Sequence, residues 1–329
     1  MNKFKDYINL SSINKTVRFM QNSGLEFCFL FGGSTTINDT KPGHEISDYD
    51  ISVSSLEEYK KAVIKLHKNN WNVKQKGTNA LSKNASVVFP PKGDENQDEY
   101  DFQFNKTIEN KSIFNLESFY IAIKKVDNDY GYKFIDPHDG MKDFEKGKLR
   151  ILPNREHEDD YNVLKRFLVL SGKYSLPMGK DGVNKDVLKQ MKDRFSVKKE
   201  NTPDHLEAKG ACLDKFFKTV QRVKNPNKFL FDIAKADIMK DAFPEMDKVL
   251  KSGVFHKFVR DNKDFSTADL LNAFYDNSKN QDEVLNELKS MKHRTKAKVP
   301  EDVMSFLDRK DKKKVHLLPM HLNRGRELG

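Results

Sequence analysis

Two stretches decide how this chain folds: Phe27-Cys28-Phe29-Leu30-Phe31-Gly32-Gly33-Ser34 and, after a polar interval, Ser47-Asp48-Tyr49-Asp50-Ile51-Ser52-Val53. The first is a short apolar run, typical of a buried strand, that ends abruptly in a diglycine turn. In the second, apolar residues alternate with acidic or hydroxyl residues, which predicts a strand with one apolar and one acidic face. The two stretches predict a diglycine bend that faces a pair of acids.

The acidic face carries the residues that point to chemistry. Asp48 and Asp50 are two positions apart, so their carboxylates point to the same side of the strand. Two adjacent bare carboxylates repel each other, and a hard divalent cation such as magnesium relieves that repulsion. Asp101, in an alternating strand predicted for 100–104, is positioned to supply a third carboxylate. Such a site can hold metal ions that bridge nucleotide phosphates and activate an attacking hydroxyl.

The diglycine turn predicts phosphate binding. Gly32 and Gly33 let the backbone approach a phosphate closely, and free amides with the Ser34 hydroxyl can bind its oxygens. A diglycine or an acid pair alone also occurs in ordinary turns and on solvated strand faces. Their order along the chain is more specific than either one.

The remaining pattern predicts an α+β protein in two parts. Residues 1–150 form a head with a small mixed sheet and helices, and residues 151–329 form an all-helical neck and body. In the head we expect a helix at 113–126 and a turn at 129–132. In the body we expect helices at 159–170, 206–223, 229–242, 246–260, 267–275 and 282–291. The final stretch, 291–329, has 11 basic and 5 acidic residues and so a net charge of +6.

Composition bounds the class of protein. Hydrophobic residues make up 37% and charged residues 33%, which is enough apolar material for a core and argues against global disorder. With 59 basic and 49 acidic residues the net charge is +10, which favours polyanionic partners. Cys28 and Cys212 have no metal-ligand spacing, so neither a disulfide framework nor structural zinc is expected. Without an 18-residue apolar stretch or an N-terminal signal core, we expect no membrane partner and a cytoplasmic location.

Three later segments complete the pattern: Ile135-Asp136-Pro137-His138-Asp139-Gly140-Met141-Lys142-Asp143-Phe144, Leu149-Arg150, and Glu158-Asp159 followed by a basic helix. With the diglycine and acidic stretches, they resemble the polymerase β superfamily of nucleotidyltransferases. The branch they resemble is the bacterial poly(A) polymerases and class II CCA-adding tRNA nucleotidyltransferases. There, I-D-P-x-x-G-x-x-D-L is followed by L-R and E-D-x-x-R-x-L-R, and order and spacing agree over roughly residues 25–172.

The resemblance implies a reaction and its participants. An RNA 3′-hydroxyl, on tRNA or another RNA end, would attack the α-phosphate of ATP or CTP and release pyrophosphate. Two magnesium ions would be held by Asp48 and Asp50, which with Asp101 are the candidate catalytic residues. The nucleotide would be bound by Gly32, Gly33, Ser34, Glu158, Asp159, Lys165 and Arg166.

The sequence departs from this branch at three places, one of which is the stretch after the diglycine, where residues 35–39 stand in place of the usual V-R-D. Where the branch has R-R-D-F-T-x-N-A, this chain has residues 115–123, which lack the Arg pair, the Asp and the Asn, and Asn162 stands at the first Arg after E-D. Three hypotheses follow: a template-independent RNA 3′-nucleotidyltransferase, a toxin-like or small-molecule nucleotidyltransferase with another acceptor, and a non-catalytic RNA-binding relative.

Overall fold

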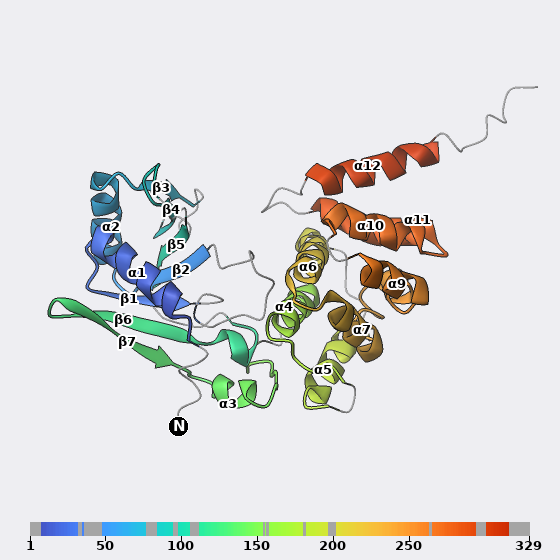
Figure 1. Cartoon of the computed structure of the whole chain (residues 1–329), viewed down its shortest axis with the longest axis horizontal. Helices are drawn as coiled ribbons and strands as arrows, with labels where there is room; N and C mark the ends of the chain where they lie inside the picture. Colours follow the sequence, from blue (N-terminus) through green and yellow to red (C-terminus); the bar gives the residue numbers. More distant parts are fainter. Residues whose placement is uncertain are drawn as a thin grey trace, which may run out of the picture. The chain divides into compact units, whose positions relative to one another are not determined.

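The structure is a computed structural model of the whole chain, and the chain forms two compact units, Met1–Glu156 and His157–Gly329, each described here by itself (Figure 1). The first unit contains the elements from blue α1 to green α3 in that figure, and the second contains the helices from light-green α4 to red α12. The structure describes residues 8–31, 35, 48–76, 84–94, 98–105, 112–153, 155, 158–179, 182–196, 202–262, 265–293 and 301–315.

The first unit is built on a seven-stranded mixed sheet with the order β3-β4-β5-β2-β1-β6-β7 among its described residues. β2 and β5 run parallel, and every other neighbouring pair is antiparallel. The acidic strand β2 therefore lies in the middle of the sheet. The strands are β1 (Phe27–Phe31), β2 (Asp48–Val53), β3 (Asn72–Gln75), β4 (Ala85–Phe89), β5 (Glu99–Phe104), β6 (Tyr120–Val126) and β7 (Asp129–Ile135).

Helices α1 (Leu10–Ser23) and α2 (Leu56–Lys68) cover one face of this sheet. Phe19 of α1 packs on Tyr100 and Phe102, with ring centroids 5.0 and 5.2 Å apart. The single tryptophan of the chain, Trp71, is buried in the same cluster. Because the core residues of β2 and β5 point toward the helices, the alternating acids of both strands are turned to the opposite face.

The structure corrects the expected helix at 113–126 and the expected turn at 129–132. Only 115–117 is helical, as the 3₁₀ turn η4 (Asn115–Glu117), and β6 and β7 then form a hairpin. The hairpin reverses at Asp127, which has the left-handed φ of 55°. Ile121 and Ile123 are fully buried at a spacing of two, and β6 pairs with β1 along five residues. Sheet pairing therefore overrides an apolar spacing that also fits a helix.

The segment Ile135–Arg150 has a structural role in the first unit. Asp136 accepts the backbone N–H groups of Gly140 (2.8 Å) and Met141 (2.9 Å) at the start of α3 (Gly140–Phe144). The fully buried Asn115 donates to Asp143 (2.8 Å) and accepts the backbone N–H of Arg150 (2.9 Å). These hydrogen bonds hold η4, α3 and the backbone at Arg150 together.

Gly140 sits where a side chain has no room. A Cβ added there would lie 2.5 Å from the carbonyl oxygen of Asn115 and 2.7 Å from the Phe119 ring. We therefore expect Gly140→Ala to lower the unfolding free energy of the first unit by about 1–3 kcal/mol, the usual cost of overpacking. Denaturant unfolding followed by Trp71 fluorescence measures this unit alone.

Gly131 is the matched control for this substitution. It lies in β7, and a Cβ added there would make only an ordinary contact, 3.7 Å from Val126. Gly131→Ala should leave the unfolding midpoint unchanged or slightly raised. Equal midpoints for both variants would contradict the tight packing inferred at Gly140.

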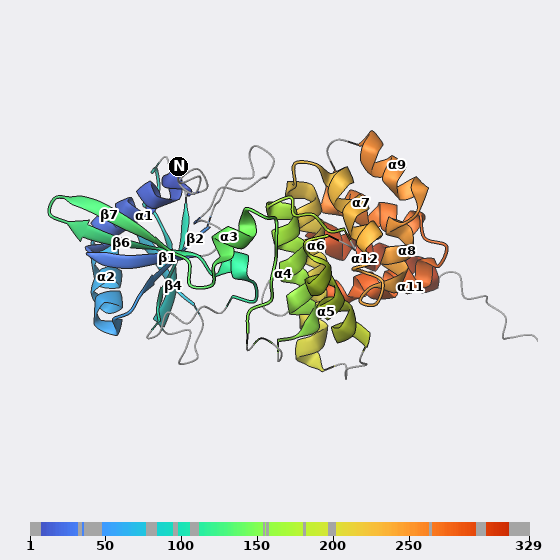
Figure 2. The same cartoon turned by 90° about the horizontal axis from the view of Figure 1, so that it is seen from below.

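The second unit is helical throughout its described part, and α4 and α6 lie side by side in it (Figure 2). Its core is rich in phenylalanine: Phe216, Phe217, Phe255 and Phe274 are buried and in ring contact. The helices are α4 (Asp160–Lys173), α5 (Lys185–Ser196), α6 (Pro203–Arg222), α7 (Pro226–Ala236), α8 (Pro244–Leu250), α9 (Gly253–Asp261), α10 (Thr267–Asp276), α11 (Gln281–Lys289) and α12 (Glu301–Val315), with the 3₁₀ turn η5 (Ser290–His293).

Two expected helices of this unit end earlier than their apolar pattern suggests. The helix expected at 229–242 stops at Ala236, where Asp237 takes the left-handed φ of 56°. The helix expected at 246–260 is divided into α8 and α9, because the Ser252 side chain accepts the Phe255 N–H and caps a new helix. In both places a local cap ends the helix, although the apolar periodicity of the sequence continues.

Two further expectations bear on the class of protein. Cys28 and Cys212 are both buried and free, and burial raises the pKa of each thiol. Among the residues that the structure describes, no helix is both long and apolar enough to cross a bilayer.

Candidate active site

The acids of β2 and β5 lie next to each other on the sheet face opposite the helices. In the parallel pairing of these strands, Asp50 is the register partner of Asp101, and Asp48 is that of Glu99. Register partners point to the same face, so four carboxylates share a small area of sheet. Asp48 is exposed, whereas Asp50, Glu99 and Asp101 are half-buried.

Burial and the neighbouring acids act together on the pKa of Glu99. Burial raises the pKa of the Glu99 carboxyl, and the negative charges of Asp101 and Asp48 raise it further. Lys76 and Lys74 act in the opposite direction, by stabilising the carboxylate. An acidic cluster that raises the pKa of one of its members is a site where an added cation is favourable.

The two carboxylate oxygens of Asp101 have different surroundings. Lys76 Nζ contacts Asp101 Oδ2 at 2.5 Å. Asp101 Oδ1 is buried without a hydrogen-bond partner among the described residues. A buried carboxylate oxygen without a partner is costly, and it is a natural ligand for a cation.

The donor set fits magnesium in its chemistry. It consists of carboxylate oxygens, the ligands that this hard ion prefers. The described residues by themselves contain no three His, Cys, Asp or Glu side chains close enough to enclose a metal ion. Magnesium usually takes one or two carboxylates from a protein and completes its coordination with water and substrate phosphates.

The predicted diglycine turn, Gly32, Gly33 and Ser34, lies outside the described residues. Its surroundings are fixed on both sides. Phe31, the last residue of β1, is the register partner of Asp50. Thr35 is buried, and its carbonyl oxygen accepts the N–H of Asn9 at 3.2 Å, just before α1. β1 therefore ends beside Asp50, at the residue before the predicted turn.

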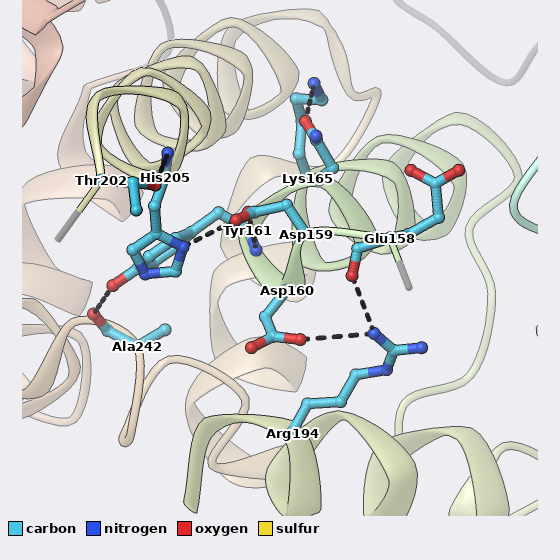
Figure 3. Close-up of polar contacts among 10 residues, drawn as sticks. Glu158, Asp159, Asp160, Tyr161, Lys165, Arg194, Thr202, His205 and Ala242 are labelled. Carbon is cyan, nitrogen blue, oxygen red and sulfur yellow. Dashed lines mark hydrogen bonds and ion pairs between the residues drawn. The ribbon is translucent and has the colours of Figure 1, made fainter. Parts of the chain in front are cut away.

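The other predicted nucleotide-binding residues belong to the second unit, at the start of α4 (Figure 3). Asp159 caps this helix: one carboxylate oxygen accepts the Tyr161 N–H (2.9 Å), and the other lies 2.6 Å from His205 Nδ1. The Glu158 carbonyl oxygen accepts a hydrogen bond from Arg194 at 3.1 Å, and Arg194 also pairs with the buried Asp160. Both oxygens of Asp159 thus have structural partners.

Lys165 and Arg166 lie one turn further along α4. Lys165 is half-buried and donates to the side-chain oxygen of Asn162 at 2.7 Å, whereas Arg166 is exposed. Asn162 stands where the resembled branch has an arginine. In this chain its side-chain amide pairs with the Lys165 ammonium group. Their roles in nucleotide binding remain predictions.

A cavity of about 390 Å³ lies on the other side of the sheet from the acids. It is lined by residues of α2, β3 and β4, among them Tyr59, Val63, Val73 and Ser86. Val73 and Ser86 alternate with the residues that share the face of Asp101, so they point toward the helices. The cavity is therefore separate from the candidate active site.

Comparison with known proteins identifies the architecture. No protein-family model and no curated protein matches the sequence. Among solved structures, the Thermotoga maritima CCA-adding enzyme complexed with tRNA is 17% identical with a TM-score of 0.55, over 93% of this chain and 71% of that one. A CCA-adding enzyme in complex with ATP is 16% identical (TM-score 0.55; 94% and 71%). A tRNA-processing enzyme with CTP is 13% identical (TM-score 0.52; 94% and 93%).

The chain has a polymerase β-type nucleotidyltransferase fold. This confirms the predicted α+β architecture, a mixed-sheet unit followed by a helical one. At 13–17% identity the likeness concerns the fold, and chemistry has to be argued from the residues themselves.

Sequence reasoning missed three residues of the acidic face. Glu99 is two positions before Asp101 on β5, so the same alternation that selected Asp101 could have found it. Lys74 lies in β3, and Lys76 directly follows that strand. This edge strand has no clear apolar alternation from which it could have been predicted. Only the sheet order brings these lysines near the acids.

Proposed function

We propose that this protein is a metal-dependent nucleotidyltransferase that transfers a nucleoside monophosphate from ATP or CTP to an RNA 3′-hydroxyl. The observation that carries the proposal is the set of four carboxylates, Asp48, Asp50, Glu99 and Asp101, on the sheet face opposite α1 and α2. In this reading residues 1–150 are the nucleotidyltransferase head, and residues 151–329 are the neck and body with a basic C-terminal segment. The corresponding process is RNA 3′-end processing, in which poly(A) or CCA is added to a tRNA or to another RNA.

Asp48 and Asp50 would hold the magnesium ions, which when bound would neutralise phosphate charge and make the 3′-hydroxyl a better nucleophile. The amides of Gly32 and Gly33 and the hydroxyl of Ser34 would bind the triphosphate. Asp101, on the strand that pairs with β2 and opposite Asp50 in register, would accept the proton of the attacking hydroxyl. The new bond joins the 3′-oxygen to the α-phosphorus, the bond from that phosphorus to the bridging oxygen breaks, and pyrophosphate leaves.

Glu158, Asp159, Lys165 and Arg166 are proposed to contact the base and phosphates from the start of α4. Positioning and charge neutralisation carry most of such a reaction, so little other acid–base chemistry is required from the protein. The missing R-R-D-F-T-x-N-A segment therefore bears on nucleotide choice more than on phosphoryl transfer.

The test is transfer of label from nucleotides labelled at the α-phosphate. Purified protein with magnesium, each of the four triphosphates in turn and total tRNA should extend the RNA with AMP or CMP. Removal of magnesium with a chelator should stop the reaction, and restored magnesium should recover it.

The fate of the label separates the three hypotheses. Label on a protein or a small molecule, with no RNA extension, would support a different acceptor. RNA binding with a steep salt dependence but no label transfer would indicate the non-catalytic relative.

A further inference from the structure

Two lysines, Lys74 and Lys76, lie beside the four carboxylates of β2 and β5, on the side away from β1. Lys74 is the register partner of Val87, which is that of Asp101, so Lys74 shares the face of the acids. Lys76, two positions later, has the same orientation and contacts Asp101 directly. Both ammonium groups are exposed at the edge of the sheet.

The sheet order assigns a side to each substrate of the proposed reaction. β1, which leads into Gly32, adjoins β2 on one side, whereas β5, β4 and β3 lie on the other. A triphosphate bound at the turn after β1 therefore lies on the β1 side of Asp50. The attacking hydroxyl must approach the α-phosphorus from the side opposite the leaving pyrophosphate. That is the side of Asp101 and the two lysines.

We infer that Lys74 and Lys76 bind the backbone phosphates of the acceptor RNA at its 3′ end, and that they do not bind the nucleotide. This inference rests on the proposed function and adds residues that specify the acceptor. Two lysines at the edge of a strongly acidic face attract a polyanion that the carboxylates alone would repel. Lys74 Nζ also lies 5.5 Å from the Phe89 ring centroid, which holds its stem along β4.

The inference predicts which Michaelis constant changes. We expect Lys74→Met and Lys76→Met each to raise the KM for a single-stranded RNA acceptor about fivefold near ~0.1 M salt, and the double variant about 25-fold, because each lost phosphate contact removes about 0.7 from the salt slope. The KM for the triphosphate should not change. Lys76→Arg should restore most of the acceptor affinity, since the charge is kept.

Lys68→Met is the matched control, because Lys68 is an exposed lysine on α2, on the other side of the sheet. Binding of a labelled RNA with a 3′-deoxy end, measured by fluorescence anisotropy over a range of salt concentrations, gives the slope without chemistry. Lys76 also contacts Asp101, so Lys76→Met can disturb that carboxylate as well as remove an RNA contact. The binding measurement separates the two effects because it involves no reaction. Lys74→Met is a second check, because Lys74 has no contact with the Asp101 carboxylate among the described residues.

The outcomes are distinct. A higher acceptor KM with an unchanged triphosphate KM, and a flatter salt dependence, supports the inference. A higher triphosphate KM, or no change in either constant, overturns it while RNA extension by the wild type keeps the proposed function intact. If the wild type extends no RNA and labels another acceptor, the proposed function fails together with this inference.

Discussion

Asp48→Asn and Asp50→Asn should each reduce the rate of nucleotide transfer by about 10³-fold or more. Each substitution removes one negative ligand and leaves the shape of the side chain nearly unchanged. Metal-based charge stabilisation contributes several kcal/mol to the transition state, and each ~1.4 kcal/mol is a tenfold change in rate. Single-turnover rates with saturating RNA and ATP or CTP measure the effect on chemistry alone.

Asp129→Asn is the control for this prediction. Asp129 is an exposed acid at the start of β7, where it accepts the N–H of Tyr130, and it lies three strands from β2. Its substitution should leave the rate unchanged. A loss of less than tenfold in both Asp48→Asn and Asp50→Asn would mean that these carboxylates do not hold the metal.

Phe102→Ala should destabilise the first unit by about 3–5 kcal/mol, the usual cost of removing a buried phenylalanine ring. Phe102 is fully buried at the centre of the core, where its ring is 4.9 Å from Tyr59 and 5.2 Å from Phe19. Since a domain is typically stable by only about 5–15 kcal/mol, this is a large share of the total. Denaturant unfolding followed by Trp71 fluorescence reports the change.

The same experiment has an internal control in Tyr132→Ala. Tyr132 lies on β7 and is 45% exposed, so its loss should cost far less than that of Phe102. If Phe102→Ala and Tyr132→Ala shifted the midpoint equally, the packing of α1 and α2 on the sheet would be wrong. Calorimetry of the helical unit should be unchanged in both variants.

The predictable part of the fold is the part whose local and tertiary signals agree. In β1 a continuous apolar run matches a strand buried at the centre of a sheet, and in β2 alternation matches one covered face. The helix at α2 has an apolar stripe and a serine cap, Ser55, that accepts the Glu58 N–H. At 113–126 the signals conflict, since Leu116 and Phe119 fit a helical spacing while Ile121 and Ile123 fit a strand.

The candidate site could be predicted only where one strand contains its residues. The spacing of Asp48 and Asp50 fixes their common face, whereas the pairing of Asp50 with Asp101 depends on the parallel register of β2 and β5. Sequence spacing carries no information on that register, nor on the edge strand that brings Lys76 to Asp101. The role of Asp159 stays a prediction: its position after Glu158 suggested nucleotide contact, and both of its oxygens have partners within its own unit.

The central claim, that Asp48 and Asp50 of β2 hold the catalytic metal, is tested most directly by manganese binding. Mn²⁺ can replace Mg²⁺ at carboxylate sites, and electron paramagnetic resonance counts the free ion. With a non-hydrolysable ATP or CTP analogue present, the wild type should bind Mn²⁺ tightly, and the protein carrying both Asp48→Asn and Asp50→Asn should lose that binding while keeping the wild-type Trp71 fluorescence. Equal Mn²⁺ binding by the two proteins would contradict the account.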